Sequence, residues 1–527
     1  MNLLRSAAVI ALYTLLSRVL GFIRDLLIAA TLGAGPIADA FFVAFRLPNL
    51  FRRLFAEGAF SAAFAPIFAA ALTGRGPNAA RAFAEDALAA AMALSIVLTA
   101  LGEIAMPALV AALAPGFFDD EAQFTRTVEM ARLAFPYLGL MTLTALASAV
   151  LNGVGKFAAA AAAPILLNLV AIAALLGFAD LGRTPGHVLA GAVALSGVAQ
   201  MALVVIAAKR AGYHLRLRLP RLTSQIRRLG RLMGPGVLAA GATQINIVVG
   251  SQLASLLAAG AISHLYYADR VYQLPLGVIG VGLGVALLPQ ISREAQSGDE
   301  AAARKSLARA VEISLWLTLP AAAAALAIPA ILVAALFERG AFAPADTIAT
   351  AGALAAYAAG LPAFVLSKTL APAFFARADT RTPARAAAMA VGLNIALGLA
   401  LIWPFGHVGL ALATTLASWA QTAWLASRLI RRGWYDPDGA SRRNLAGLVA
   451  AALAMAAALW FAAPPIVALV HSDAARLAVT IAVCAGGGLL YLAFAHALGA
   501  ARLDDAWREL RGRRGGDELD GGAPPAR

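Results

Sequence analysis

Two arginines and an aspartate interrupt an apolar stretch near the start of the chain, in the segment SRVLGFIRD. Arg18 and Asp25 are seven residues apart and share one face of a helix, while Arg24 reaches the same space through its long side chain. A guanidinium group binds phosphate oxygens in a bidentate fork, so these residues could hold an oxygen-rich anion.

Two further segments repeat this combination of charge and apolar sequence. In ADAFFVAFRLPNLFRRLFAEG, Asp39, Arg46 and Arg53 recur every seven residues, and Glu57 lies four residues beyond Arg53. In YYADRVYQLPLG, an aspartate and an arginine are adjacent. Together the three segments hold six arginines and four carboxylates, namely Arg18, Arg24, Arg46, Arg52, Arg53 and Arg270 with Asp25, Asp39, Glu57 and Asp269.

The charges of these segments allow two interpretations. The four acids could form ion pairs that hold helices together, or they could act in gating, and the sequence fits both roles equally. Such ion pairs would not account for the surplus of arginines, because an arginine at the centre of a membrane helix costs about 2.5–3.5 kcal/mol. We therefore expect a cavity with excess positive charge that binds an anionic head group.

The elements that carry these residues are expected to be membrane-spanning helices. Apolar residues make up 61 % of the 527 residues and charged residues only 13 %. Apolar runs of about 20 residues, long enough to cross a bilayer, recur along the chain. The sequence thus predicts an all-α polytopic membrane protein with about fourteen transmembrane helices. They are expected at residues 6–32, 37–70, 83–114, 124–150, 157–180, 186–208, 233–259, 264–290, 308–336, 346–374, 384–404, 407–428, 444–469 and 477–500.

The loops between these helices predict the orientation. Lys and Arg gather in the loops after every second span, which marks those loops as cytoplasmic. The opposite loops hold only Arg183, Arg339 and Arg476, and the loop GFFDDEAQ is acidic. Both termini are therefore expected in the cytoplasm. The net charge of +14 follows from this topology, so it does not indicate nucleic acid as a partner.

An internal repeat predicts the architecture. Pro136 and Asn168 have the same spacing as Pro362 and Asn394. Six spans in each copy give two parallel six-helix lobes around a central cavity, with two extra C-terminal helices. The predicted parts are an N-terminal lobe (1–212), a basic cytoplasmic linker (213–232), a C-terminal lobe (233–433), two added helices (444–500) and a disordered cytoplasmic tail (501–527).

Other motifs give no sign of an enzyme, a metal or a cofactor. The run GVIGVGLG lies within an apolar span and lacks the strands of a dinucleotide site. NGVGK lacks the spacing of an ATP-binding loop. Cys484 is the one cysteine, and the six histidines are scattered. No acid lies between Asp180 and Asp269, so the seventh span offers no carboxylate to a coupling ion.

The charged segments also carry a family resemblance. SRVLGFIRD, GAGPIADAFFVAFRLPNLFRRLFAEGAFSAAFAPIF, YYADRVYQLPLGVIGVGLGVALLP and LAPAFFARADTRTP resemble the MurJ (MviN) lipid II flippases of the MOP exporter superfamily. The resemblance covers about residues 1–500. It implies fourteen spans, two lobes around a cavity, and a groove for the polyprenyl tail at the last two helices.

The resemblance further implies the function and the roles of residues. Lipid II, an undecaprenyl-diphosphate-linked disaccharide peptide, would pass from the cytoplasmic to the periplasmic leaflet of the bacterial inner membrane. Membrane lipids and cell-wall synthesis proteins are the further partners. Alternatives are a flippase for another undecaprenyl-diphosphate-linked glycan, or a scaffold of the cell-wall machinery. The implied substrate-binding residues are Arg18, Arg24, Arg52 and Arg270, and the implied gating or ion-pair residues are Asp25, Asp39, Arg53, Glu57 and Asp269.

Overall fold

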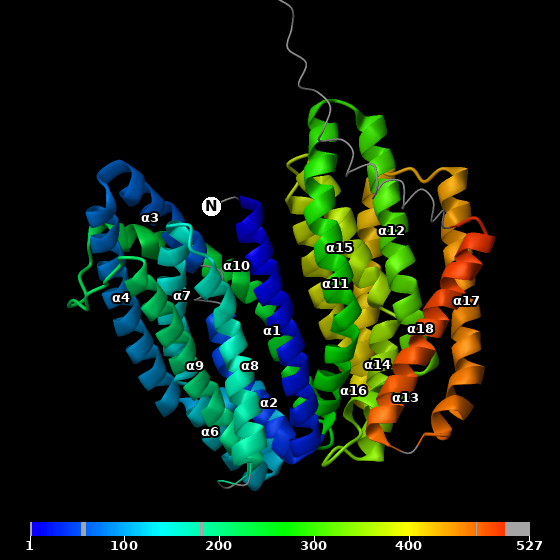
Figure 1. Ribbon diagram of the computed structural model, residues 1–527, viewed down its shortest axis with the longest axis horizontal. Coiled ribbons are helices and arrows are strands. Elements are labelled where there is room, and N and C mark those ends of the chain that lie inside the picture. The colour runs from blue at the N-terminus through cyan, green and yellow to red at the C-terminus, as the bar shows by residue number, and fades with distance from the viewer. Residues whose placement is uncertain (1–2, 54–59, 180, 182–183, 471, 501–527) are drawn as a thin grey trace, which may run out of the picture. The chain divides into compact units, whose positions relative to one another are not determined.

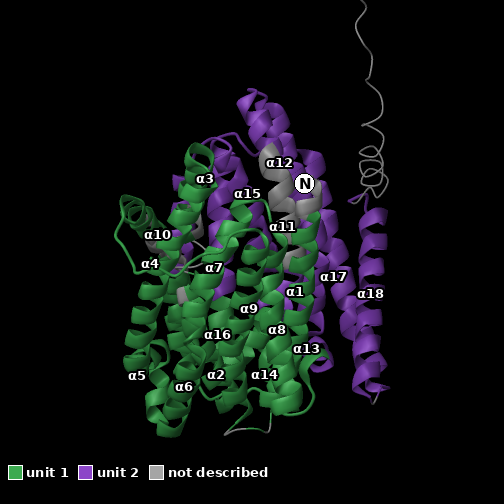
Figure 2. Cartoon of the chain, turned by 60° about the vertical axis from the view of Figure 1, so that its left-hand side comes forward, with its two compact units in different colours: residues 1–270, 336–353, 393–413 green, residues 271–335, 354–392, 414–527 purple. Residues whose placement is uncertain are grey.

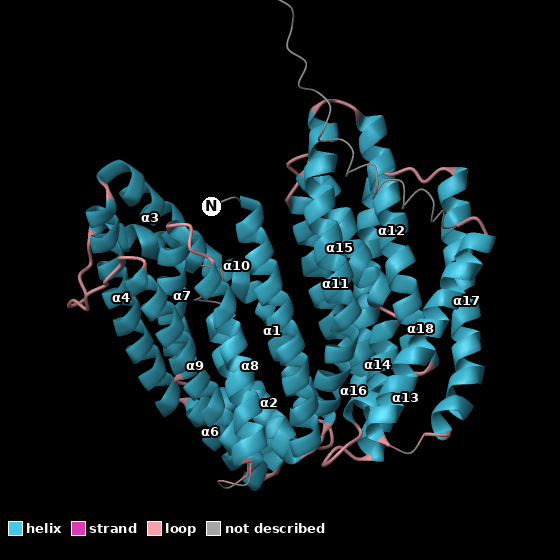
Figure 3. Ribbon diagram, in the orientation of Figure 1, coloured by secondary structure: helices cyan, strands magenta, loops and turns pink. Residues whose placement is uncertain are grey.

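The computed structural model describes residues 3–53, 60–179, 181, 184–470 and 472–500. Within these ranges every regular element is a helix, and short loops join the helices (Figure 3). The predicted all-α membrane fold class is confirmed. The predicted tail at 501–527 and the candidate residue Glu57 lie outside the described residues.

The helices follow the predicted apolar runs, several of which divide into two (Figure 1). Their bounds are α1 Leu3–Leu32, α2 Pro36–Phe51, α3 Ser61–Arg75, α4 Pro77–Ile104, α5 Met106–Leu113, the 3₁₀ helix η2 Pro115–Asp119, α6 Glu121–Ala134, α7 Tyr137–Gly153, α8 Ala158–Phe178, α9 Pro185–Arg210, α10 Ser224–Ser255, α11 Ala261–Gln296, α12 Glu300–Ala327, α13 Pro329–Phe337, α14 Pro344–Ala358, α15 Leu361–Phe375, α16 Arg381–Arg431, α17 Gly439–Ala468 and α18 Asp473–Ala497.

Nine helical stretches in the described part of the chain are long and apolar enough to cross a membrane. The longest is α16, with 51 residues, and it contains two of the predicted spans. Its helical geometry breaks at Gly406, between those spans, where φ is 56° and ψ is −136°. The predicted number of fourteen helices is not established by this count and stays a prediction.

Glycine, proline and capping side chains set the ends of the helices. Gly33 ends α1 with a φ of 65°, a conformation that other residues rarely adopt, and Pro36 begins α2. Asp120 accepts a hydrogen bond from the Gln123 amide at the start of α6, and Thr223 accepts one from Ile226 at the start of α10. Each cap satisfies a backbone N–H that the helix itself leaves unpaired.

The chain divides into two compact units (Figure 2). The first holds residues 1–270, 336–353 and 393–413, and the second holds 271–335, 354–392 and 414–527. The lobe boundaries expected from the repeat, at 212 and 233, stay a prediction.

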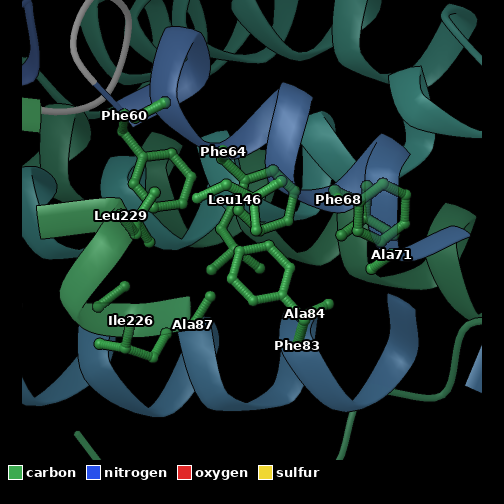
Figure 4. Close-up of a cluster of buried hydrophobic side chains, with 14 of the residues drawn as sticks. Phe60, Phe64, Phe68, Ala71, Phe83, Ala84, Ala87, Leu146, Ile226 and Leu229 are labelled. Atoms are coloured by element: carbon green, nitrogen blue, oxygen red, sulfur yellow. The ribbon is translucent and has the colours of Figure 1, made fainter. Parts of the chain in front are cut away.

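In the first unit, α1 packs on α8, and α8 packs on α9 (Figure 1). A buried aromatic cluster joins α3, α4 and the start of α10 (Figure 4). Phe64 lies at its centre, with ring centroids 5.4 Å from Phe68 and 5.2 Å from Phe83. Ile226 and Leu229 close the cluster from α10. Close packing of these rings holds the helices together through van der Waals contact, since lipid is as apolar as the cluster.

In the second unit, α12 packs against α15 and α17, and α17 packs against α18. Polar contacts fix the loops at one end of these helices. Arg377 pairs with Glu300, and Arg432 lies 2.6 Å from Asp379. The pKa of Asp379 lies below its usual value because Thr382 and Arg432 donate hydrogen bonds to the carboxylate.

The two asparagines that mark the predicted repeat both contact a neighbouring helix. Asn168 on α8 donates to the carbonyl of Ser17 on α1, with an N···O distance of 2.9 Å. Asn394 on α16 donates to Asn246 on α10, at 2.6 Å. In each case the contacted helix is the first of the predicted lobe, and the repeat itself stays a prediction.

Candidate anion-binding site

Arg24 and Asp25 are neighbours on α1, and both turn inward toward α8 and α11. The Arg24 guanidinium donates to Asp25 Oδ1 through Nε at 3.1 Å and Nη2 at 2.7 Å. Its Nη1 donates to Asn168 Oδ1 at 3.0 Å. The long side chain therefore brings Arg24 into the space beside Asp25, as the helical geometry predicted. Asp25 is buried, with only 2 % of the residue exposed.

Helix α11 supplies the second basic group. Arg270 Nε lies 3.3 Å from Asp25 Oδ2, and its guanidinium carbon lies 4.5 Å from the centre of the Tyr266 ring. The Tyr266 hydroxyl donates to Asp25 Oδ1 at 3.1 Å. Phe42 of α2 stacks on that ring with centroids 3.9 Å apart. The site is thus built by four helices of the first unit.

Two guanidinium groups meet at a single carboxylate. Arg24 and Arg270 both pair with Asp25, and the half-buried Asp269 lies beside Arg270 in the sequence. The Arg24 side chain is 11 % exposed and that of Arg270 is 34 % exposed. Water screens such partly buried charges poorly, so the exposed part of the Arg270 guanidinium is suited to contact an anion.

The other predicted binding arginines lie outside this group. Arg18 is exposed on α1, and no hydrogen bond or ion pair joins it to another described residue. Arg52 directly follows α2 and donates to Asn49 Oδ1 at 3.3 Å, while Arg53 is exposed. Asp269 is half-buried on α11, next to Arg270. The structure therefore brings together Arg24, Arg270 and Asp25 from the predicted set.

Asp39 contacts the start of α11. Its carboxylate accepts the backbone N–H of Gly260 at 2.6 Å and that of Ser263 at 2.8 Å, and it also accepts the Ser263 hydroxyl. Gly260 directly precedes α11 and Ser263 lies in its first turn, where a negative charge is stabilised. Asp39 thus fastens the helix that carries Arg270.

The turn between α1 and α2 packs closely against the segment before α14. The Ala341 amide donates to the Ala30 carbonyl at 2.7 Å. A β-carbon added at Gly340 would lie 2.2 Å from that carbonyl oxygen, and one added at Gly33 would lie 2.5 Å from the carbonyl oxygen of Ala341. Only glycine permits these approaches, so the turn holds α1 in a defined position.

Sequence reasoning missed Asn168, Tyr266 and Ser263 as parts of the site. Asn168 had been singled out, but only as a marker of the repeat, and Tyr266 lies within a motif chosen for its charges. Their contacts depend on which helices pack together, and the sequence alone does not state that.

The fold defines the class of protein. It matches a solved structure described as lipid II flippase MurJ in an inward closed conformation, with a TM-score of 0.74, 22 % identity, and coverage of 92 % of this chain and 97 % of that one. It also matches an inward-facing multidrug resistance MATE family transporter of the MOP superfamily, with a TM-score of 0.65, 16 % identity, and coverage of 81 % and 98 %. The chain thus has the fold of the MOP transporters.

The family follows from the sequence comparisons. A family model described as lipid II flippase MurJ matches residues 28–473, and the chain belongs to this MurJ family. A probable lipid II flippase MurJ of Rhizobium meliloti is 41 % identical over 97 % of each chain, and one of Rhizobium tropici is 44 % identical over 86 % of each. The lipid II flippase MurJ of Burkholderia cenocepacia is 36 % identical over 86 % of this chain and 89 % of its own. The family resemblance noted in the sequence is confirmed.

Proposed function

We propose that this protein moves lipid II from the cytoplasmic to the periplasmic leaflet by alternating access, without a chemical step. One observation carries the proposal, namely the grouping of two guanidinium groups, those of Arg24 and Arg270, around Asp25. The diphosphate of a polyprenyl-linked sugar is a compact anion whose oxygens suit guanidinium groups. The names of the relatives of this chain point to the same substrate.

Each candidate residue has a role in this proposal. Arg24 and Arg270 bind the diphosphate, and the exposed Arg18 on α1 meets the head group as it enters. Arg52 joins them when the substrate is bound. Exchange of ion-pair partners as the transporter changes state involves Asp25, Arg53, Glu57 and Asp269, with Arg53 pairing with an acid. Asp39 instead holds the start of α11 through backbone N–H groups.

The proposal includes a topology. Lobes at 1–212 and 233–433 alternate in access, and the helices at 444–500 hold the polyprenyl tail. The distribution of Lys and Arg among the loops supports cytoplasmic termini in a bacterial inner membrane. Membrane lipids surround the spans, and the cell-wall synthesis machinery uses the product.

Complementation tests this function. A bacterium is depleted of its essential lipid II flippase, this chain is expressed, and lipid II accessible on the outer leaflet is assayed. We expect rescue by the native chain, loss of rescue with Arg24→Ala or Arg270→Ala, and full rescue with Arg431→Ala, which removes an exposed arginine in the last turn of α16. Failure of the well-expressed, inserted native chain would contradict lipid II as the substrate and favour another polyprenyl-linked glycan.

A further inference from the structure

The segment between α9 and α10 places large apolar side chains on the surface. This basic segment, residues 213–223, forms no helix or strand. Its first residues, Tyr213 and Leu215, pack against the aromatic cluster of the first unit. Beyond them, Leu217, Leu219 and Leu222 are 66 %, 82 % and 75 % exposed. Three nearly bare leucines within a few residues are unusual on a surface that faces only water.

A buried carboxylate holds the basic segment in place. Glu85 of α4 is 2 % exposed, and its Oε1 accepts the backbone N–H of Arg216 at 3.1 Å. Its Oε2 lies 2.5 Å from Arg218, while Arg81 lies 3.3 Å from Oε1 and also donates to the His214 carbonyl. A buried carboxylate with this many donors is well satisfied. The leucines are therefore held outward by a fixed backbone.

The first turns of α10 continue the same surface. Ile226 and Leu229 point into the aromatic cluster (Figure 4). The exposed arginines around them and in the basic segment are Arg216, Arg218, Arg221, Arg227, Arg228 and Arg231, of which Arg218 pairs with Glu85. The segment itself contains no acid, and the carboxylate shown in contact with it is that of Glu85. We call residues 213–232 the linker surface.

We propose that the linker surface docks onto anionic phospholipids, with its arginines on the head groups and Leu217, Leu219 and Leu222 inserted at the boundary with the acyl chains. Interleaved basic and apolar side chains are the composition that binds an anionic membrane surface. A free phosphate or a soluble acidic partner would use the arginines and leave the leucines in water. The linker surface also begins three residues after Arg210, the last residue of the apolar helix α9, which places it near the bilayer.

This inference does not depend on the transported substrate. In this proposal Glu85 is a positioning residue, because its carboxylate fixes the linker surface on α4. The docked linker surface then sets the height of the first unit at the membrane surface. Each arginine near an anionic surface contributes about 1 kcal/mol, which is about fivefold in the docking equilibrium.

The test uses the full chain with a fluorescent probe. Cys484 is replaced by serine, Leu219→Cys is labelled with an environment-sensitive dye, and the protein is placed in nanodiscs of phosphatidylcholine alone or mixed with phosphatidylglycerol. We expect blue-shifted emission, and quenching by lipids that carry a nitroxide near the head group, mainly in the mixed discs. The matched control is Asn78→Cys at the exposed start of α4, which should report water in both discs.

Two sets of variants test the two parts of the linker surface. Arg221→Gln with Arg228→Gln should lower the docking equilibrium constant by about twenty-fivefold. Leu217→Ser with Leu222→Ser should reduce the quenching without changing the thermal stability, because both side chains are exposed. Equal quenching in the two kinds of disc, or no effect of the arginine variants, would overturn the role of anionic lipid. A water-exposed probe in the mixed discs would overturn the docking itself.

Discussion

Asn168 offers a way to separate charge from geometry at the anion site. Its Oδ1 accepts a hydrogen bond from Arg24 at 3.0 Å, and its Nδ2 donates to the Ser17 carbonyl at 2.9 Å. Asn168→Asp keeps an acceptor for Arg24 and adds a negative charge. Asn168→Ala removes the acceptor and adds no charge. Both variants lose the hydrogen bond to the Ser17 carbonyl, so this loss does not contribute to the difference between them.

The size of the charge effect follows from the distances. The Arg24 guanidinium lies between the side chain of residue 168 and a bound phosphate. Its Nη1 is 3.0 Å from Asn168 Oδ1, and a phosphate oxygen bound to it would lie at about 2.8 Å. A new negative charge about 6 Å from one phosphate charge costs roughly 3 kcal/mol at an effective dielectric constant of about 20, or about a hundredfold in affinity. Loss of the hydrogen bond alone costs about 1.5 kcal/mol, or about tenfold, because Asp25 still holds Arg24.

The assay is equilibrium binding of lipid II to the purified variants, with thermal stability measured alongside. Our account predicts that Asn168→Ala binds more tightly than Asn168→Asp, by about tenfold. If Asn168→Asp binds as well as the alanine variant or better, then geometry outweighs charge, and the reasoning from excess positive charge is refuted. Asn168→Leu is a further control, since it adds bulk but no charge.

Three further substitutions test the supports of the site through thermal unfolding in detergent. Asp39→Ala should destabilise the protein by about 2–4 kcal/mol because two N–H groups at the start of α11 lose their acceptor. Asp39→Asn should cost less, and equal stability of the two variants would contradict the capping role. Tyr266→Phe should cost about 1–2 kcal/mol by removing the hydrogen bond to Asp25 while the ring stacking remains; an unchanged melting temperature would show that this hydroxyl is dispensable. Gly340→Ala should unfold more readily than Gly155→Ala. Both glycines have a positive φ, but only the β-carbon added at Gly340 would meet another atom within 4 Å. Equal losses of stability in the two variants would argue against the close turn.

Much of the fold could be predicted because membrane helices leave a strong pattern. Apolar runs located the helices, and the break of α16 at Gly406 falls between two predicted spans. Lys and Arg gather in every second loop, and this distribution predicts the orientation of the chain in the membrane. Division of single predicted spans, such as 308–336 into α12 and α13, was missed because no polar loop separates the two parts.

The site could be predicted in part. A charge inside an apolar helix is costly, so Arg24, Asp25 and Arg270 stood out one by one. Their grouping around one carboxylate required the packing of α1 against α11, which no local pattern encodes. The same holds for Asp39, where pairing with an arginine was expected and the structure shows backbone N–H groups of α11 as donors.

The most direct measurement is the affinity of the purified protein for lipid II, compared with that for a lipid that carries the same polyprenyl chain and a single phosphate. Our account predicts a clear preference for the diphosphate in the native protein, and a loss of about tenfold or more in affinity for lipid II with Arg270→Gln. Equal affinity of the native protein for the two lipids, or unchanged binding of lipid II by a folded Arg270→Gln variant, would contradict the central claim.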